Sequence, residues 1–389
     1  MPRLSSLVLK TLAGLGITLP AGGGINWGST LNVTRTAVYA AYDAGSETNY
    51  EFGTAGLACT DNHTIVGRIT SSSPTSNWQR YGAAYIFDNN TGELLYSHTP
   101  TLPGDQYTNT KFGTVVGISD THYAVLQYNR LYVYDLATGL LLWNVSISGS
   151  GISTHRISIV GTYIILGVYY TGILIYDIAT GNAVTPPSLP AGYTNHVDVG
   201  RSTYATEDYL VFGSRGSNFN TGPGAVHIYR MEAGFPYVGT VVNPTTNPQS
   251  YFGWRQEWPA IAVSAMSNRI AISNPEEQIG GNPVGRIYVY ALDTQTLLYT
   301  IESPGAHISY RWPQNLFVTD SHLFAGWTTS QIHIYDISTG QLVTILNGLA
   351  NYNFGTQISV SPHRLVSNGS FDSTSTPRKV DLFNLYDIL

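Results

Sequence analysis

The chain has 389 residues, of which 11% are charged and 12% are aromatic, and its formal net charge is −6. A negative balance of this kind excludes a nucleic-acid-binding module with a broad basic footprint. Cys59 is the only cysteine, which excludes an intrachain disulfide and a metal cluster held by several thiolates.

Residues 1–29 form an apolar arm that ends in a glycine-rich hinge at Gly22, Gly23 and Gly24. Lys10 interrupts the apolar run, and no stretch reaches the ~18 apolar residues that a membrane-spanning helix needs. We therefore predict no membrane span and interpret the arm as a tether that contacts another protein. A cleaved secretory signal is the alternative interpretation of the same residues.

A strand is predicted over residues 31–41, which are rich in β-branched and aromatic side chains. The segment Trp27-Gly28-Ser29-Thr30-Leu31-Asn32 overlaps its start. This segment resembles the Trp-Gly-x-x-Leu-Asn sequence often found near the start of phage tail and fibre proteins. The resemblance implies a structural protein of a virion.

From residue 52 onward the chain repeats a hairpin, in which two alternating apolar strands flank a turn that ends in Thr-Gly. The aromatic residue that closes the first of these strands recurs at intervals of 42 to 61 residues. These residues are Phe87, Tyr134, Tyr176, Tyr229, Tyr290, Tyr335 and Phe383. Such a period is typical of a four-stranded propeller blade with variable loops.

We therefore predict an all-β fold, a seven-bladed β-propeller of four-stranded antiparallel blades, with six or eight blades as alternatives. The blades fall at about residues 52–100, 112–147, 152–189, 196–244, 251–304, 308–348 and 354–389. The last of these segments is too short for a fourth strand. Strand 31–41 is expected to complete it beside residues 380–385 and so to close the ring. The chain then divides into an arm, 1–29, and a propeller, 30–389.

Phe-Gly pairs open several of the predicted blades. They occur at Phe52-Gly53-Thr54, Phe112-Gly113-Thr114, Phe252-Gly253 and Phe354-Gly355-Thr356. This pattern resembles the FG-GAP type of propeller repeat, whose integrin members carry a calcium loop of alternating acidic residues. The nearest segment in this chain, 88–93, lacks the alternating carboxylates and is interpreted as a turn, so no metal site is predicted.

One further match concerns the spacing Asp135-x-x-Thr138-Gly139-x-x-x-Trp143, which resembles the tryptophan-docking repeat of quinoprotein dehydrogenases. The equivalent positions in three other blades hold Tyr96, Thr185 and Thr344. The array of docking tryptophans is therefore expected to be absent. We interpret the match as a sign of blade packing and predict no quinone or other cofactor.

Motifs for catalysis are missing from the sequence, which has neither a Gly-x-Ser-x-Gly elbow nor a His-Glu-x-x-His metal motif. His227 and His333 occupy matching positions in two repeats and are interpreted as packed or solvent-facing residues. Asp135, Asp177 and Asp336 precede turns, where aspartate accepts local backbone hydrogen bonds. The sequence predicts a protein without enzymatic activity.

The longest connections within blades join the second strand to the third, at residues 71–80, 215–224, 275–285 and 369–379. Strand alternation collects them on one face, together with the connections between blades. We expect this face to bind a partner, since arginine and aromatic residues are typical of interfaces. The predicted contact residues are Trp78, Arg80, Trp254, Arg255, Trp258, Tyr310, Arg311 and Trp312. The alternative is that the tryptophans fill gaps between blades beneath the loops.

These observations favour a non-enzymatic interaction propeller that serves as a structural or surface protein of a phage virion. Residues 1–29 would contact other virion or surface proteins, and the long-loop face would bind a protein or a glycan. The alternatives are an extracellular or cell-surface adhesion propeller and an extracellular enzyme acting on glycans.

Overall fold

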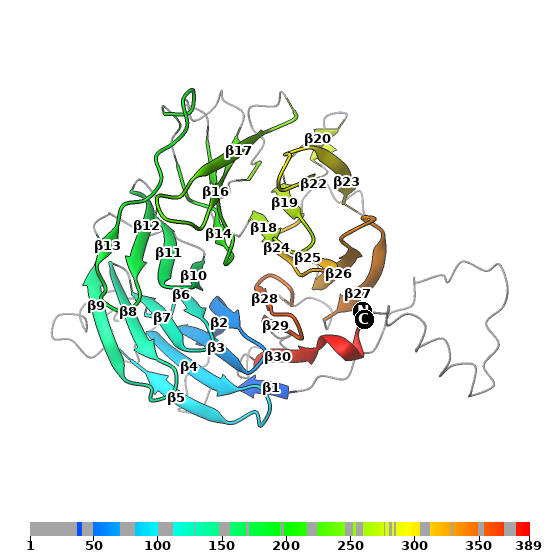
Figure 1. Ribbon diagram of the computed structural model, residues 1–389. Helices are drawn as coiled ribbons and strands as arrows, with labels where there is room; N and C mark the ends of the chain where they lie inside the picture. The colour runs from blue at the N-terminus through cyan, green and yellow to red at the C-terminus, as the bar shows by residue number, and fades with distance from the viewer. Residues whose placement is uncertain are drawn as a thin grey trace, which may run out of the picture.

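The computed structural model describes residues 37–40, 50–70, 82–99, 112–127, 129–147, 156–168, 171–194, 196, 198–215, 224–245, 252–253, 260–275, 277–279, 282–283, 285–303, 312–327, 330–348, 354–368 and 379–389. Within these residues the chain forms seven four-stranded antiparallel sheets, arranged around a ring as propeller blades (Figure 1). The predicted all-β, seven-bladed fold is confirmed.

Within each blade the strands follow one another outward from the centre of the ring, so that the first strand is innermost (Figure 1). Blade 1 consists of β2 (Tyr50–Cys59), β3 (His63–Thr70), β4 (Gly82–Asp88) and β5 (Leu94–His98). Blade 2 consists of β6 (Val115–Ile118), β7 (His122–Gln127), β8 (Arg130–Asp135) and β9 (Leu141–Ser146). Blade 3 consists of β10 (Ile157–Val160), β11 (Tyr163–Val168), β12 (Gly172–Asp177) and β13 (Ala183–Val184). Blade 4 consists of β14 (Thr203–Ala205), β15 (Tyr209–Ser214), β16 (Ala225–Arg230) and β17 (Tyr237–Val242).

The remaining blades repeat the pattern with one insertion. Blade 5 consists of β18 (Ile261–Ser264), β19 (Arg269–Asn274), β22 (Arg286–Ala291) and β23 (Leu297–Glu302), with a small hairpin of β20 (Gln278–Ile279) and β21 (Asn282–Pro283) inserted between its second and third strands. Blade 6 consists of β24 (Asn315–Val318), β25 (His322–Trp327), β26 (Gln331–Asp336) and β27 (Leu342–Asn347). Blade 7 contains β28 (Ile358–Val360), β29 (Arg364–Asn368) and β30 (Lys379–Asn384), and a short 3-10 helix, η1 (Leu385–Asp387), follows it. In the described part of the chain no helix is long and apolar enough to cross a membrane.

The ring is closed by β1 (Ala37–Ala40), which forms the fourth strand of blade 7. It pairs antiparallel with β30, with Ala37 opposite Leu382 and Ala40 opposite Lys379. Closure by an amino-terminal strand beside residues 380–385 is therefore confirmed for residues 37–40. The predicted arm, 1–29, and the first part of the predicted strand, 31–36, lie outside the described residues.

The hydrophobic core is divided among the seven junctions between blades. Each of seven apolar clusters in the described residues joins two neighbouring blades, and the cluster between blades 1 and 2, for example, combines Ile65 and Ile86 with Tyr123 and Tyr132. Middle strands such as β15 are buried along their whole length, whereas the outer strand β9 is partly exposed. Because side chains on both faces of a middle strand meet a neighbouring blade, these strands read as continuous apolar runs.

The Phe-Gly pairs belong to these junctions. Phe52, Phe112, Phe252 and Phe354 are at most 2% exposed, and each contacts a ring of the third strand of its own blade at 5.4 to 6.0 Å. Gly113 follows in a left-handed conformation (φ +86°), and a Cβ there would lie 2.4 Å from the backbone oxygen of Ala83 in the preceding blade. The motif is thus a packing device, because only glycine permits this approach of two blades.

The turns between third and fourth strands follow the predicted Asp-x-x-Thr-Gly chemistry. Asp135 Oδ1 accepts hydrogen bonds from the amide of Thr138 at 2.8 Å and from its hydroxyl at 2.6 Å. Asp177 accepts the same pair from Thr180, and Asp336 accepts bonds from Ser338 and Thr339. Asp88 likewise accepts the amides of residues 90 and 91, which confirms that segment 88–93 is a turn.

Each of three such turns is clasped by an aromatic residue on the outer strand of the preceding blade. Trp143 Nε1 donates to the carbonyl of Ile178 at 2.8 Å, and its ring covers Gly181. Tyr96 and Tyr299 repeat this contact by donating to Ala137 and Ile337. The interpretation of the docking spacing as blade packing is correct. Tryptophan makes this contact in one of the three turns, and a tyrosine hydroxyl takes the place of the indole N–H in the other two.

Candidate functional site

Strand topology separates two unlike faces of the ring. The connections between second and third strands, and those between blades, leave from one face, which we call the long-loop face. The turns between first and second strands, and between third and fourth strands, lie on the opposite face, the short-turn face. Of the four long connections, the one in blade 5 is described in part and carries the hairpin β20–β21.

Most of the predicted contact residues cannot be placed on that face. Trp78, Arg80, Trp254, Arg255, Trp258, Tyr310 and Arg311 lie outside the described residues. Trp312 is described and is 0% exposed. Its ring packs between blades 5 and 6, with centroids 6.3 Å from His333 and 6.4 Å from Tyr335.

Trp312 is therefore corrected from a contact residue to a core residue. Trp312 lies in the same apolar cluster as Trp327, in the junction between blades 5 and 6. A tryptophan offers more apolar area than any other side chain, and burial in the core removes it from any surface. The alternative interpretation, that tryptophans fill gaps between blades, holds for Trp312.

The base of the blade 5 insertion is held by a buried acidic side chain. Glu277 is 3% exposed, and its carboxylate accepts hydrogen bonds from Asn274 Nδ2 at 3.0 Å, Arg286 Nη1 at 2.7 Å and the Tyr288 hydroxyl at 2.5 Å. Burial and the bond to Glu277 raise the pKa of Tyr288, so the phenol stays a neutral donor. Arg286 continues the network outward to Glu302, whose side chain is 57% exposed.

This network fixes the start of the hairpin β20–β21 to two strands of the blade, β19 and β22. A buried carboxylate is stable only when donors compensate for its lost hydration, and here three donors do so. The long-loop face therefore has at least one insertion mounted on a rigid frame. The sequence analysis did not identify Glu277. Only 11% of the residues are charged, so an acidic residue inside an insertion could have been recognised as a candidate for a structural role.

A second buried charge group lies at the base of the blade 4 insertion. Asp198, which is 5% exposed, lies 3.8 Å from Arg201 Nη1 and 3.8 Å from Arg215 Nη1. Burial raises the pKa of Asp198, and the two guanidinium groups oppose that shift. Arg215 directly follows β15, at the start of the connection to β16. Two of the four long connections thus begin beside buried ionic groups.

The two histidines at matching repeat positions are packed, as interpreted. His227 is 0% exposed and bonds Ser214 Oγ through Nε2 at 2.8 Å and Thr240 Oγ1 through Nδ1 at 2.9 Å. His333 is 1% exposed between Trp312 and Trp327. Burial lowers the pKa of each to about 4, so both are neutral at physiological pH. They are core residues, and no group of three or more potential metal-binding side chains occurs in the described residues.

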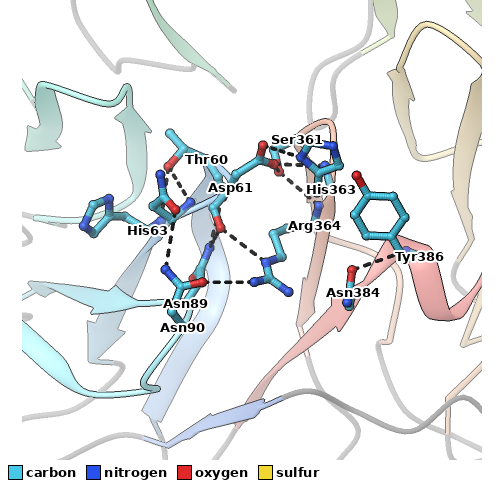
Figure 2. Close-up of polar contacts among 11 residues, drawn as sticks. Thr60, Asp61, His63, Asn89, Asn90, Ser361, His363, Arg364, Asn384 and Tyr386 are labelled. Carbon is cyan, nitrogen blue, oxygen red and sulfur yellow. Dashed lines mark hydrogen bonds and ion pairs between the residues drawn. The ribbon is translucent and has the colours of Figure 1, made fainter.

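On the short-turn face, a polar cluster joins blade 7 to blade 1 (Figure 2). Asp61, in the first turn of blade 1, accepts hydrogen bonds from Ser361 Oγ at 2.6 Å and from the amide of His363 at 2.9 Å, and its Oδ2 lies 2.7 Å from His363 Nδ1. Burial opposes ionisation of Asp61, but these bonds outweigh it and lower the pKa of the carboxyl.

The same cluster extends to the carboxyl-terminal segment and to the next turn of blade 1. The ring of His363 stacks on Tyr386 of η1, with centroids 5.0 Å apart (Figure 2). Arg364 donates to the carbonyl of Asp61 and to Asn90 Oδ1, so three turns and η1 meet at this point. An aspartate that orients a histidine also occurs in hydrolytic sites. Here, however, every partner of Asp61 belongs to the junction that closes the ring, and the cluster is a ring-closing contact.

Comparison with known proteins supports the fold and identifies no family for the chain. No family model matches the chain, and no curated protein sequence matches it. Among solved structures, the crystal structure of BamB from Moraxella catarrhalis superposes with a TM-score of 0.52 and 13% sequence identity. The match covers 90% of this chain and 100% of BamB. The likeness supports the β-propeller fold described above. At this identity the likeness is one of fold alone.

Proposed function

We propose that this protein is a non-enzymatic interaction propeller that binds a protein or glycan partner through its long-loop face. One observation carries the proposal. The topology collects the long connections on one face, and the described base of the blade 5 insertion is locked by the buried Glu277 network. Binding residues are commonly found in loops that a rigid scaffold presents.

The contrast with the opposite face supports this assignment. On the short-turn face, the aspartates of the turns between third and fourth strands accept local hydrogen bonds from the turn itself. The aromatic residues Tyr96, Trp143 and Tyr299 are occupied by contacts between blades. The short-turn face is built for holding the ring together, which leaves the long-loop face for recognition.

The proposed setting is a phage virion, with residues 1–29 as the attachment to other virion proteins. The apolar arm and the segment Trp27–Asn32 support this setting, and the FG-GAP-type Phe-Gly repeats fit a protein used for adhesion or assembly. A mass-spectrometric survey of purified virions tests it. Recovery of the chain in stoichiometric amounts with other structural proteins is expected, and its absence from virions would leave an extracellular or cell-surface adhesion propeller as the better assignment.

The face itself is tested with two substitutions from successive blades. Trp258→Ala and Arg311→Ala should each weaken partner or glycan binding, by about 2 kcal/mol or more if the side chain is an interface anchor. Tyr386→Ala is the matched control, because Tyr386 is a 73% exposed aromatic residue on the short-turn face. Loss of binding in the control alone, on a glycan array or with isolated virion proteins, would contradict the proposal.

An enzyme acting on glycans is the competing function, and the oriented pair Asp61–His363 is the described arrangement that favours it. Turnover of any member of a glycan panel, abolished by His363→Ala, would support that function. Our proposal predicts that no such turnover occurs and that His363→Ala changes stability only.

A further inference from the structure

Large apolar side chains that are exposed in the described residues gather at one end of the blades. With the exception of Val242, they lie in turns of the short-turn face, at the strand starts beside those turns, or in the segment that follows β30. They are Leu95, Leu140, Leu141, Leu142, Tyr237, Met266, Leu297, Leu298, Leu342, Tyr386 and Leu389. The largest group belongs to blades 1 and 2, and we call its members, Leu95 and Leu140–Leu142, the leucine patch. Exposed apolar groups of this kind mark contact sites.

A contact between blades holds the two parts of the leucine patch together. Tyr96 directly follows Leu95, and its hydroxyl donates to the carbonyl of Ala137 at 2.7 Å. A Cβ at Gly139, which directly precedes Leu140, would lie 2.5 Å from Cδ1 of the Tyr96 ring. Leu95 and Leu140 therefore flank one contact, although they belong to different blades.

Two β-bulges contribute to the exposure of the leucine patch. In blade 2 the register shifts between Val133 and Tyr134, which leaves Leu142 without a partner on β8. Leu95 occupies the equivalent bulge position in blade 1. A bulge re-aims side chains, and Leu142 is 48% exposed. Both outer strands, β5 and β9, lack lysine, arginine, aspartate and glutamate, whereas exposed sheet edges are usually protected by charges. The patch therefore has the properties of a surface that another segment covers.

The turns around the leucine patch are acidic. Carboxylates lie in or directly beside the short turns of blades 1 and 2, and these turns contain no lysine or arginine. They are Asp61, Asp88, Glu93, Asp120 and Asp135. Hydrogen bonds within the turns lower the pKa of Asp88 and Asp135, so both groups are negative at neutral pH. Arg364 of blade 7 contacts one edge of this group, at the carbonyl of Asp61 and at Asn90. An occupant that complements the patch is apolar and basic.

The amino-terminal arm of this chain, residues 1–29, has that composition. Its leucines lie between residues 4 and 19, in the same stretch as Lys10. Arg3 adds a second positive charge, and no aspartate or glutamate occurs before Asp43. The segment with the fewest acidic residues and the most leucine is thus part of the same molecule as the acidic, leucine-bearing surface.

The arm is also attached close to the patch. β1 begins at Ala37, opposite Leu382 and near the short-turn end of β30, and blade 7 packs directly on blade 1. Residues 20–36 separate the apolar run from β1 and can span about 60 Å when extended. This length exceeds several-fold the separation of about 10 Å between packed sheets. A tethered segment meets its site at an effective concentration in the millimolar range, which favours the chain's own arm over the arm of another copy.

We propose that the leucine patch is the docking site of the chain's own amino-terminal arm in the free protein. The leucines of the arm cover Leu95 and Leu140–Leu142, and Arg3 and Lys10 face the carboxylates of the surrounding turns. Docking shields two apolar surfaces until another virion protein binds the arm. This role of the short-turn face goes beyond the recognition proposed for the long-loop face. Release of the arm rests on the proposed virion setting, whereas docking is a property of the isolated protein.

Photo-cross-linking on the isolated full-length protein tests the docking. A photoreactive residue replaces either Leu142 or Val242, whose 45% exposed side chain lies at the long-loop end of β17. Isotope-labelled and unlabelled copies are mixed in equal amounts at about 1 μM, far below the effective concentration of a tethered arm. Mass spectrometry then identifies the linked peptides. The residue at position 142 should capture residues 4–19 in pairs of peptides from the same copy, and the residue at position 242 should capture none of them.

Substitutions separate the two kinds of contact. Arg3→Glu combined with Lys10→Glu should weaken docking about 10-fold, the factor that corresponds to two exposed ion pairs of about 0.7 kcal/mol each. Leu140→Gln should lower the yield of arm cross-links several-fold. Met266→Gln, at an 84% exposed side chain of blade 5, is the matched control and should leave the yield unchanged.

Three results would overturn the proposal. They are no capture of the arm from position 142, equal capture from position 242, and links that join labelled to unlabelled peptides, which would place the arm on a second copy. The survey of purified virions is independent of all three. Failure of docking is therefore distinguishable from failure of the proposed function.

Discussion

The clasp between neighbouring blades can be tested with two glycines that share a backbone conformation and differ in their surroundings. Gly92 and Gly181 close equivalent turns with φ of +77° and +71°. A Cβ at Gly92 meets no atom within 4 Å, whereas at Gly181 it would lie 2.9 Å from Cδ2 of Trp143. Gly92→Ala therefore measures the backbone cost alone, and Gly181→Ala adds the collision with the clasp.

The magnitudes follow from these contacts. An alanine in the left-handed region costs about 1–2 kcal/mol, and the loss of unfolded-state entropy returns about 0.4–1 kcal/mol. Gly92→Ala should therefore lower the free energy of unfolding by about 1 kcal/mol. At Gly181 the indole must move, which breaks the bond to the carbonyl of Ile178, worth about 1 kcal/mol, and exposes ring surface worth about 1 kcal/mol more. We expect a total of about 3 kcal/mol.

Equilibrium unfolding in urea, compared at equal m-value, measures both variants. In a Trp143→Ala background, Gly181→Ala should cost no more than Gly92→Ala, because the collision is gone. The resulting coupling energy of about 2 kcal/mol isolates the clasp from the backbone term. Equal losses for Gly92→Ala and Gly181→Ala in the natural background would refute the reasoning.

Three further predictions concern closure, anchoring and titration. Deleting residues 1–43 should lower the unfolding temperature sharply, because it removes β1 and exposes the edge of β30; an unchanged temperature would contradict closure by this strand. Glu277→Gln should cost about 2–3 kcal/mol of stability by replacing a buried carboxylate that accepts three hydrogen bonds, whereas Glu302→Gln, at the exposed end of the network, should cost less than about 1 kcal/mol. Burial holds the pKa of His227 and His333 near 4, whereas histidine in the unfolded chain has a pKa of about 6.5. Their contribution to stability is therefore present above about pH 6.5 and is lost as the pH falls toward 4. The slope should reach about 1.4 kcal/mol per pH unit for each histidine, and His333→Gln should reduce it in unfolding measurements across that range.

The repeat could be predicted from the sequence because its signals are local. The turn aspartates, the Thr-Gly pairs and the Phe-Gly pairs act within a few residues of their own positions, and each recurs often enough to count blades. The missing strand of blade 7 was predictable for the same reason, since one segment had too few strands and another had a spare one. Each blade of this fold has four strands, so a missing strand and its donor can be recognised from the sequence alone.

The contacts between blades were harder to predict. Tyr96 and Trp143 both donate a hydrogen bond to a backbone carbonyl of the next blade. Because the two side chains differ in length, the sequence spacing does not show that both donors reach a carbonyl. Trp312 was misplaced because its burial depends on residues of blade 5 that are far from it in the sequence, such as Ala262 and Ile287. The pairing of Arg156 with Tyr204 and Phe317 joins residues from three blades, which no local pattern encodes.

Photo-cross-linking from the two faces of the ring tests the assignment of recognition to the long-loop face most directly. A photoreactive residue is placed at Glu302 or Asn347, which are exposed at the long-loop ends of β23 and β27, and at Thr138 or Thr339 in exposed turns of the opposite face. The protein is irradiated in its natural assembly, and the cross-linked chains are identified by mass spectrometry. We predict that one partner is captured from Glu302 and Asn347 and is absent from the Thr138 and Thr339 samples. Capture of the partner from the short-turn face alone would contradict the assignment.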